Sequence, residues 1–298
     1  MASIYEKQSE PLIIQCLFAQ RRNYTYAKIC AGVYFVVCVA LVCFFAVLKS
    51  LYKCDFVLGL SIGLSIAVIF AASYINELIM NFKHKAATIQ QYIDTCLFAS
   101  CENSDKTWSS PLSKNDIIEK VSMHPERGFC KNDKWYADYS SQPYSNQIAY
   151  CQKENIRWDG TLRMYYRIAC NTLLILTIIL IWVISVEENP DFKQWISFIP
   201  WFLPFAKYLI TFNKNMNADK IRLDKLNKMA CEILDKDYGC CSDKYNDLID
   251  LQAQIFEHRK KAVLIPNFFF LLYRSRQQKN EELIADCVKR ESIDGFRG

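Results

Sequence analysis

The protein has 298 residues and a formal net charge of +5, from 36 Lys and Arg against 31 Asp and Glu. Hydrophobic residues make up 52% of the chain and only 8 Gly and 8 Pro are present, so the composition excludes an intrinsically disordered or collagen-like protein. The average conceals four nearly uncharged runs of 19 to 21 residues, and each is long enough to cross about 30 Å of hydrocarbon as a helix.

The chain begins with a polar segment in which apolar residues recur at helical spacing from Leu12 to Leu17. This pattern predicts an amphipathic lead-in helix over 5–27. Two uncharged runs follow, at 29–48 and 56–76, with a short loop between them. A core helix of a soluble protein is usually shorter and amphipathic, so we predict that these two runs form a transmembrane hairpin.

Small residues recur every four positions in the second of these runs. Gly59 and Gly63 form one such pair, and Ser61 and Ser65 form another. This spacing lets helix backbones approach closely in lipid, where packing drives helix association. The partner is either another helix of the same chain or a helix of a neighbouring copy, and the sequence favours neither.

The middle segment, residues 81–167, changes in composition along its length. Helical character continues from the second run to about residue 97 and returns from about residue 145. The stretch between is rich in Ser, Asn, Asp and Lys, contains three prolines and holds frequent aromatic residues. It predicts either a loop-rich cap that packs through its aromatic side chains or a mobile loop that faces a ligand.

A second hairpin is predicted from the uncharged run 168–186 and from the run 194–213, which only Lys207 interrupts. The latter run alternatively fits an interfacial or re-entrant segment. Pro200 and Pro204 lie four positions apart in it and favour a bend. Lys207 either extends to the headgroups or faces a water-filled interior, in which case this helix lines a pore.

The tail, from residue 214 onward, predicts further helices. Apolar residues at spacings of three and four form two seams, which favour packing within the chain slightly over a coiled coil between subunits. The seams are Leu223, Leu226, Ala230 and Ile233, then Leu248, Leu251 and Ile255. An aromatic block at 268–273 is too short to span a bilayer and precedes two arginines, so it is a candidate for docking at the membrane surface or for subunit packing. A last helix is predicted over 277–290.

Basic residues set the orientation of a membrane protein. Residues 81–167 hold 12 Lys and Arg and the tail holds 16, whereas the short loops of the two predicted hairpins hold few. Both termini and the middle segment are therefore predicted to face the cytoplasm. In that compartment the 14 cysteines are mostly reduced, apolar residues rather than a disulfide framework.

These elements predict an all-α membrane protein. Four transmembrane helices form two hairpins, and the middle segment and tail build a mostly helical cytoplasmic domain. The predicted boundaries are 1–28 for the lead-in, 29–80 for the first hairpin, 81–167 for the cytoplasmic segment, 168–213 for the second hairpin and 214–298 for the tail.

The sequence contains no signature of catalysis. Glycine-rich phosphate loops and the HExxH, GxSxG and calcium-loop patterns are absent, and the cysteines and three histidines lack the spacing of a metal site. We therefore predict that the protein is not an enzyme and has no catalytic residue, metal or cofactor.

Aromatic and basic residues outside the hairpins are the candidates for ligand binding. Aromatic rings stack on bases and arginine forks onto phosphate, so the set suits an anionic ligand that contains bases. The candidates are Trp135, Tyr136, Arg157, Trp158, Arg163 and Arg259. Residues of these types are more often core or surface residues. The net charge is explained by the positive-inside pattern, so neither DNA nor RNA is a predicted partner.

Three stretches carry a resemblance to a known family. They are Leu17-Phe18-Ala19-Gln20-Arg21 within 8–28, the segment 148–159 with Leu162-Arg163 after it, and Arg259 with Ile265-Pro266 ahead of the aromatic block. With two hairpins and a helical tail, they make the chain similar to the SMODS-associated four-transmembrane effectors. Those bacterial proteins are encoded beside cyclic-oligonucleotide synthases in antiphage CBASS systems.

The resemblance implies a multi-pass effector in the bacterial inner membrane. It would bind a cyclic di- or trinucleotide made by a partner synthase, form homo-oligomers and disrupt the lipid bilayer, causing abortive infection. A ligand drives such a change only if it binds one assembly state better than another. Two alternatives stay open: a constitutive channel or transporter subunit, and a membrane scaffold that recruits a cytoplasmic partner.

Overall fold

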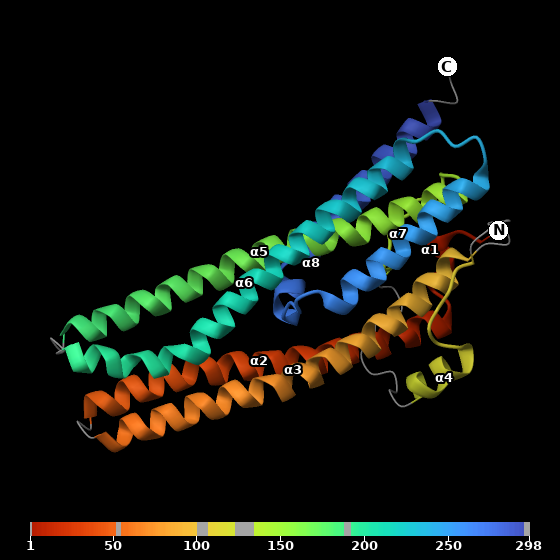
Figure 1. Ribbon diagram of the computed structural model, residues 1–298. Helices are drawn as coiled ribbons and strands as arrows, with labels where there is room; N and C mark the ends of the chain where they lie inside the picture. The colour runs from red at the N-terminus through yellow and green to blue at the C-terminus, as the bar shows by residue number, and fades with distance from the viewer. Residues whose placement is uncertain (1, 52–54, 100–106, 123–133, 188–191, 295–298) are drawn as a thin grey trace.

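The computed structural model describes residues 2–51, 55–99, 107–122, 134–187 and 192–294, and within them the protein is all-helical, as predicted. Figure 1 shows an elongated molecule in which α2 and α3 form one long hairpin and α5 and α6 form a second. The helices are α1 (Ile4–Lys7), α2 (Pro11–Leu51), α3 (Asp55–Phe98), α4 (Lys114–Ser122), α5 (Tyr144–Glu187), α6 (Phe192–Asp235), α7 (Cys241–Lys261) and α8 (Asn267–Asp294).

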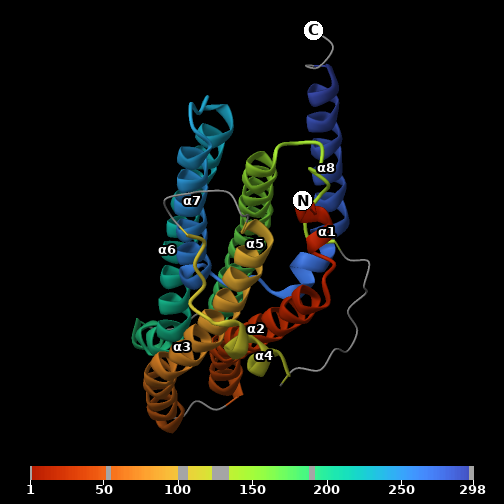
Figure 2. The ribbon, with the colours of Figure 1, turned by 90° about the vertical axis from the view of Figure 1, so that its right-hand side faces the viewer.

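The molecule divides into a four-helix stem and a helical head. We call residues 29–80 and 168–213 the stem and the remaining described residues the head. The other helices and both termini lie at the head end. The parts of the four long helices that belong to the head pack among these other helices (Figures 1 and 2). α6 is the helix of the second hairpin that packs on both α2 and α3.

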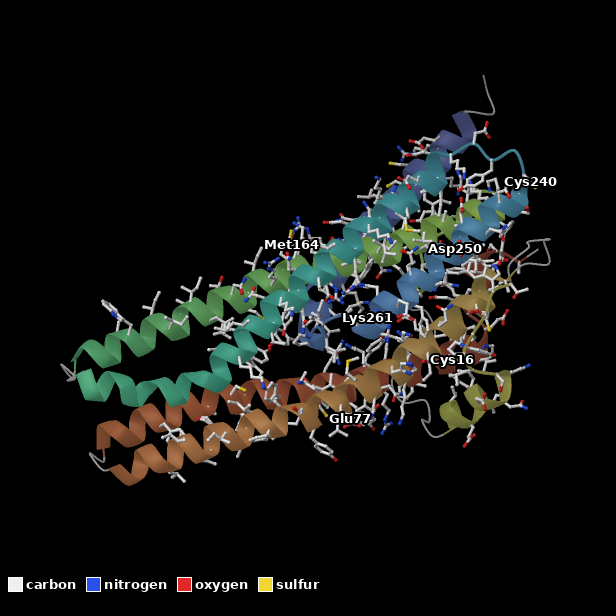
Figure 3. All side chains as sticks on the ribbon, viewed as in Figure 1. Cys16, Glu77, Met164, Cys240, Asp250 and Lys261 are labelled. Carbon is white, nitrogen blue, oxygen red and sulfur yellow. The ribbon has the colours of Figure 1, made fainter. Side chains whose placement is uncertain are left out.

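Large apolar side chains are exposed on the stem, and Figure 3 shows side chains projecting outward from its helices. Phe70 is 75% exposed, and Val36 and Ile175 are 60% and 57% exposed. Among the residues that the structure describes, one helix is long and apolar enough to cross a membrane, Ile62–Phe98 of α3. An apolar surface of this extent is not stable in water and indicates contact with lipid or protein.

The head is built around one apolar core. All seven residues of the two predicted seams are buried in it, together with side chains from α2, α3, α5 and α8. The seams therefore pack within the chain rather than between subunits. Burial of each large aliphatic side chain contributes about 1.5–3 kcal/mol to stability, so these helices hold the head together.

Predicted element boundaries fall inside continuous helices. α2 runs from the lead-in through the first apolar run, and α3, α5 and α6 likewise cross from stem to head without a break. The predicted lead-in helix 5–27 is instead divided, because Ser3 and Glu6 form a capping box for the short α1 and Pro11 begins α2. The predicted last helix, 277–290, is the second part of α8, which includes the aromatic block.

The small residues predicted to pack in α3 differ in their surroundings. A Cβ atom added to Gly59 or Gly63 would meet no described atom within 4 Å, so the described part of the chain does not pack against either glycine. Ser65 is buried at 2% exposure. The side chain of Ser61 lies outside the described residues.

The fourth apolar run forms the first half of α6. Figure 1 shows α6 changing direction in this half, which contains Pro200 and Pro204. Their side chains lie outside the described residues, and a bend is what prolines four apart in a helix favour. Lys207 follows them and is exposed.

Candidate functional site

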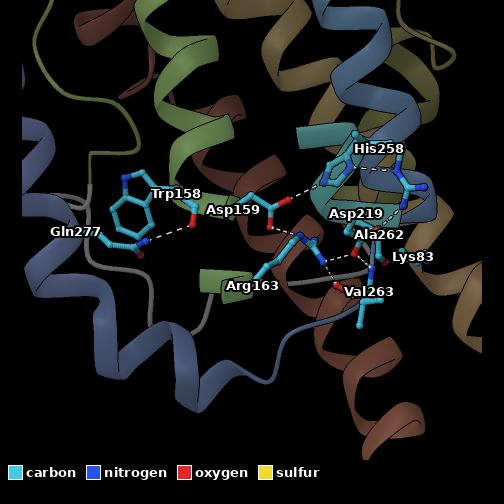
Figure 4. A network of polar contacts seen from close by, with 10 residues as sticks. Lys83, Trp158, Asp159, Arg163, Asp219, His258, Ala262, Val263 and Gln277 are labelled. Carbon is cyan, nitrogen blue, oxygen red and sulfur yellow. Dashed lines mark hydrogen bonds and ion pairs between the residues drawn. The ribbon is translucent and has the colours of Figure 1, made fainter. Parts of the chain in front are cut away.

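The end of α7 and the linker that joins it to α8 lie where the four long helices meet. We call residues 258–267 the junction segment. Each of α2, α3, α5 and α6 contributes at least one polar side chain to it, and Figure 4 shows the part of this network around Arg163. The junction segment therefore ties both hairpins to the head.

Charged side chains of α5 and α6 hold the junction segment. Asp159 Oδ2 lies 2.8 Å from His258 Nε2, and Arg163 Nη1 donates a hydrogen bond of 2.7 Å to the Val263 carbonyl. Asp219 accepts a hydrogen bond of 2.7 Å from the Val263 backbone N–H. It also pairs with Arg163 Nη1 at 2.6 Å, so one arginine joins two helices to the linker.

Lysines of α2 and α3 hold the same segment from the other hairpin. Lys83 Nζ donates to the Ala262 carbonyl at 3.1 Å, and Lys28 Nζ donates to Asn267 Oδ1 at 2.7 Å. Burial disfavours the charged form of both amines and lowers the pKa of each to about 8. The junction segment thus receives two lysines whose hydrogen bonds go to neutral oxygens.

Ion pairs compensate the remaining buried charges of the junction. Burial alone would raise the pKa of Asp159, but Arg163 and the hydrogen bond from His258 outweigh it and hold this pKa well below its usual range. Arg259 of the junction segment pairs with Asp94, a buried carboxylate of α3. Arg259 Nη2 is buried without a hydrogen-bond partner among the described residues, whereas the ion pairs of Asp94, Asp159 and Asp219 are suited to fixing helices.

A separate cleft of about 350 Å³ lies between α5 and α8. Arg157, Trp158 and Thr161 line it from α5, and Gln277, Asn280, Glu281, Leu283 and Ile284 line it from α8. The volume is at the low end of the roughly 300–1,000 Å³ of small-molecule sites. We call this the α5–α8 cleft.

The polar groups of the α5–α8 cleft are only partly satisfied. Arg157 Nε donates to Glu281 at 2.7 Å, and a second arginine nitrogen contacts the other carboxylate oxygen. Trp158 Nε1 and Gln277 Oε1 are buried and have no hydrogen-bond partner among the described residues. Behind the cleft, burial and then the charge of Glu281 raise the pKa of Glu154 to about 8.

The six predicted ligand-binding residues separate into three places. Arg157 and Trp158 meet at the α5–α8 cleft, as a ligand site would require. Arg163 and Arg259 belong to the junction instead. Trp135 and Tyr136 lie beside the lead-in, where the Gln8 side chain accepts hydrogen bonds from both of their backbone N–H groups, at 2.7 and 2.9 Å.

Tyr136 has a structural role that the sequence does not reveal. Its hydroxyl donates to Asp94 at 3.1 Å and accepts from Asn155 at 2.7 Å. Burial raises the pKa of this buried phenol well above its usual range. The side chain therefore bridges α3 and α5 inside the head and is not presented to a ligand.

Sequence reasoning missed the partners of the arginines and of Trp158. Asp94, Asp219, Glu281 and Gln277 are spread over three helices and show no motif. The ion pair of Asp159 and Arg163 could have been predicted, because a carboxylate and a guanidinium four positions apart on a helix lie on the same face. Across the described residues no group of three or more His, Cys, Asp or Glu could hold a metal ion.

Comparisons with known proteins place the chain in a family. It is 27% identical over 218 residues to a probable CBASS effector molecule of Bacillus cereus (strain VD146), which covers 71% of this chain and 70% of that protein. No solved structure matches it. The SMODS-associating 4TM effector domain matches residues 2–286, which is almost the whole length. The chain therefore belongs to the SMODS-associating 4TM effector family.

Proposed function

We propose that the protein is a CBASS effector that senses a cyclic oligonucleotide through its head, oligomerises and permeabilises the bacterial inner membrane. Family membership and the Bacillus relative support the defence role. The observation that carries the mechanism is that the stem and the head are built from the same continuous helices. An apolar stem is joined, through the polar junction, to a head with a cleft that contains arginine and tryptophan.

The stem is the membrane-inserted part in this proposal. All four of its helices include an apolar run of spanning length, and exposed apolar side chains cover the described surface of both hairpins. Charged residues concentrate in the head, which matches a cytoplasmic location for it and for both termini. The two hairpins then cross the bilayer four times.

The α5–α8 cleft is the site where the nucleotide would bind. Arg157 is one-third exposed and can exchange its carboxylate partner for a phosphate, the other anion that its planar fork fits. Trp158 provides an aromatic surface, and Asn280 provides amide groups for a base edge. With a volume of about 350 Å³ the cleft would take one nucleotide unit of a cyclic di- or trinucleotide, and the rest of such a ligand would lie outside it or against a second copy.

Oligomerisation would bring stems together in the bilayer. Gly59 and Gly63 present a face without intrachain contacts among the described atoms, and close backbone packing at such a face drives helix association in lipid. Lys207, exposed on α6, would face water at the centre of the assembly or reach the headgroups. The nucleotide must favour the assembled state for the membrane to leak only on infection.

Dye release from liposomes that contain the purified protein tests this function. Cyclic di- and trinucleotides are added singly, and release is followed together with the oligomeric state. Release and larger assemblies with at least one nucleotide are expected. Release without any nucleotide would indicate a constitutive channel, and nucleotide binding with intact liposomes would indicate a scaffold; either result would contradict the proposal.

A further inference from the structure

The first turns of α8 carry an apolar face that no described part of the chain covers. Phe268, Leu271 and Leu272 are 62%, 65% and 69% exposed. Their spacing of three and four residues puts them on one side of the helix. On the other side Phe269 packs on Tyr166 of α5, with ring centroids 5.1 Å apart, so the start of α8 is firmly held while its outer face is bare.

Contacts with two different helices fix the height of this face along the molecule. Asn267 accepts a hydrogen bond from Lys28 at 2.7 Å and donates one to Thr25 at 3.1 Å, just before the uncharged run of α2 begins. Tyr273 stacks on Tyr165 with centroids 4.4 Å apart, just before the uncharged run of α5 begins. The start of α8 therefore lies at the boundary of stem and head, as Figure 1 also shows.

Each of the four stem helices has an aromatic residue at this same height. Tyr26 of α2 contacts Phe82 of α3, with centroids 5.6 Å apart, and Tyr166 of α5 contacts Phe212 of α6 at 5.7 Å. Tyrosine is enriched at the level where a membrane protein passes from hydrocarbon to headgroups. The exposed face of α8 thus lies level with aromatic residues of all four stem helices, of which Phe212 is buried.

We propose that Phe268, Leu271 and Leu272 insert into the cytoplasmic surface of the bilayer, so that α8 begins within the boundary of headgroups and acyl chains. This inference rests on the membrane insertion of the stem proposed above. Arg274 and Arg276 follow within two turns, at the level where the helix leaves the apolar zone. Basic residues at that position suit anionic lipid headgroups.

A second copy of the chain is the competing occupant of this face. Stable protein interfaces bury about 800 Å² on each partner. Three neighbouring side chains on one short stretch of helix provide only a small part of that area. A lipid surface needs no matching partner surface and is already present at this height, so lipid is the occupant that the geometry favours.

The lipid contact has a consequence for the head. After its apolar turns, α8 forms one wall of the α5–α8 cleft, where Gln277 donates a hydrogen bond of 3.2 Å to the Trp158 carbonyl and Glu281 pairs with Arg157. In this arrangement α8 connects the membrane surface to the cleft, because one end of the helix is anchored in lipid and its middle lines the cleft. Lipid contact thereby sets the position of the cleft wall relative to the membrane.

Photo-crosslinking in the full-length protein tests the inference. Benzoylphenylalanine is placed at position 272, or at 271 as a second site, in protein reconstituted in phosphatidylethanolamine–phosphatidylglycerol liposomes. Position 283 is the matched control, because Leu283 is 62% exposed on the same helix and lies about 16 Å further from the apolar turns. Lipid adducts, measured by mass spectrometry, are expected at 271 and 272 at five times the yield at 283 or more.

Other outcomes overturn the inference in distinguishable ways. Crosslinked dimers at 272 without lipid adducts would assign the face to a second copy. Adduct yields equal to those at 283 would show that the face does not enter lipid. Extraction with alkaline carbonate separates this failure from that of the proposed function. Protein that stays in the membrane but forms no adducts contradicts only the docking of α8, whereas protein that is washed out contradicts the insertion of the stem.

Discussion

Two arginines of α5 show how differently one residue type is used in this head. Arg163 is enclosed at 9% side-chain exposure and contacts Asp159, Asp219 and the Val263 carbonyl. Arg157, six positions earlier, is 33% exposed and has one carboxylate partner among the described residues, Glu281, across a cleft. The first is enclosed among fixed partners, while the second can exchange its partner.

The different surroundings of the two arginines indicate different roles: Arg163 contributes to stability, and Arg157 is available for binding. A buried charge surrounded by fixed partners is costly to disturb, because each partner loses its compensation. A charge at the edge of a cleft keeps much of its hydration and exchanges partners at a modest cost. We therefore expect changes at the junction to unfold the head, and changes at the α5–α8 cleft to alter the response to nucleotide while the fold persists.

Arg163→Ala is expected to have the largest effect on stability. Asp219 is fully buried and would keep only Arg222 as a cationic partner, and Asp159 would lose its arginine, with an expected loss of about 3–5 kcal/mol. The midpoint of thermal unfolding in detergent measures the effect. Lys228→Ala is the matched control, because Lys228 is 78% exposed in its pair with Glu232 and should change stability by less than about 0.5 kcal/mol. Equal midpoints for the two variants would show that the junction does not hold the head.

Lys83 should make stability rise with pH. Its pKa is lowered from 10.5 to about 8 by burial, so the unfolded chain binds more protons between these two values. The stability contributed by this group is present above pH 10.5 and is lost as the pH falls to 8. Lys83→Met should remove this slope, which the difference between wild-type and variant unfolding midpoints at pH 8 to 10 measures. Parallel pH curves would contradict the buried position of this amine.

Glu154, near the α5–α8 cleft, should give the opposite dependence at lower pH. Its pKa is raised from 4.5 to about 8, so the folded protein holds the proton more tightly. Stability is then fully present below pH 4.5 and falls as the pH rises to 8. Glu154→Gln should flatten the wild-type decline between pH 5 and 8 in thermal unfolding. A variant that keeps the decline would assign it to another group.

The buried apolar faces of the helices could be predicted from the sequence, but the polar contacts of the junction could not. Periodicity shows which face of a helix is buried, and this sufficed for the seam from Leu223 to Ile233. It does not show which helix covers that face. The pair of Asp94 and Arg259 joins residues 165 positions apart, and the contact of Lys83 with Ala262 joins residues 179 apart. Such pairs depend on the tertiary arrangement.

The same limit explains why the candidate site was only half predicted. Trp158 and Arg157 lie in one turn of α5 and could be singled out together, whereas Gln277 and Glu281 meet them only because α8 packs across α5. Trp135 and Tyr136 resembled ligand-binding residues by type alone. Their hydrogen bonds to Gln8 and Asp94 depend on segments far away in the sequence.

The smallest effect on stability and the sharpest effect on function are expected at Arg157. The double variant Arg157→Gln, Glu281→Gln removes both charges of the cleft pair, so neither charged group is left buried without its partner. Stability should change by about 1 kcal/mol or less, because the arginine is partly exposed. Nucleotide affinity should fall about tenfold or more, because a charge-assisted contact to phosphate is lost.

Titration of nucleotide-triggered dye release and of direct binding measures this effect, with thermal unfolding alongside. Lys228→Ala again provides the exposed control, since it removes a positive charge from the head far from any cleft residue in sequence. A double variant that binds and releases dye as the wild type does would place the nucleotide elsewhere. Loss of the response with an unchanged midpoint would locate recognition at the α5–α8 cleft, because only a group that the fold does not require can be removed without unfolding the head.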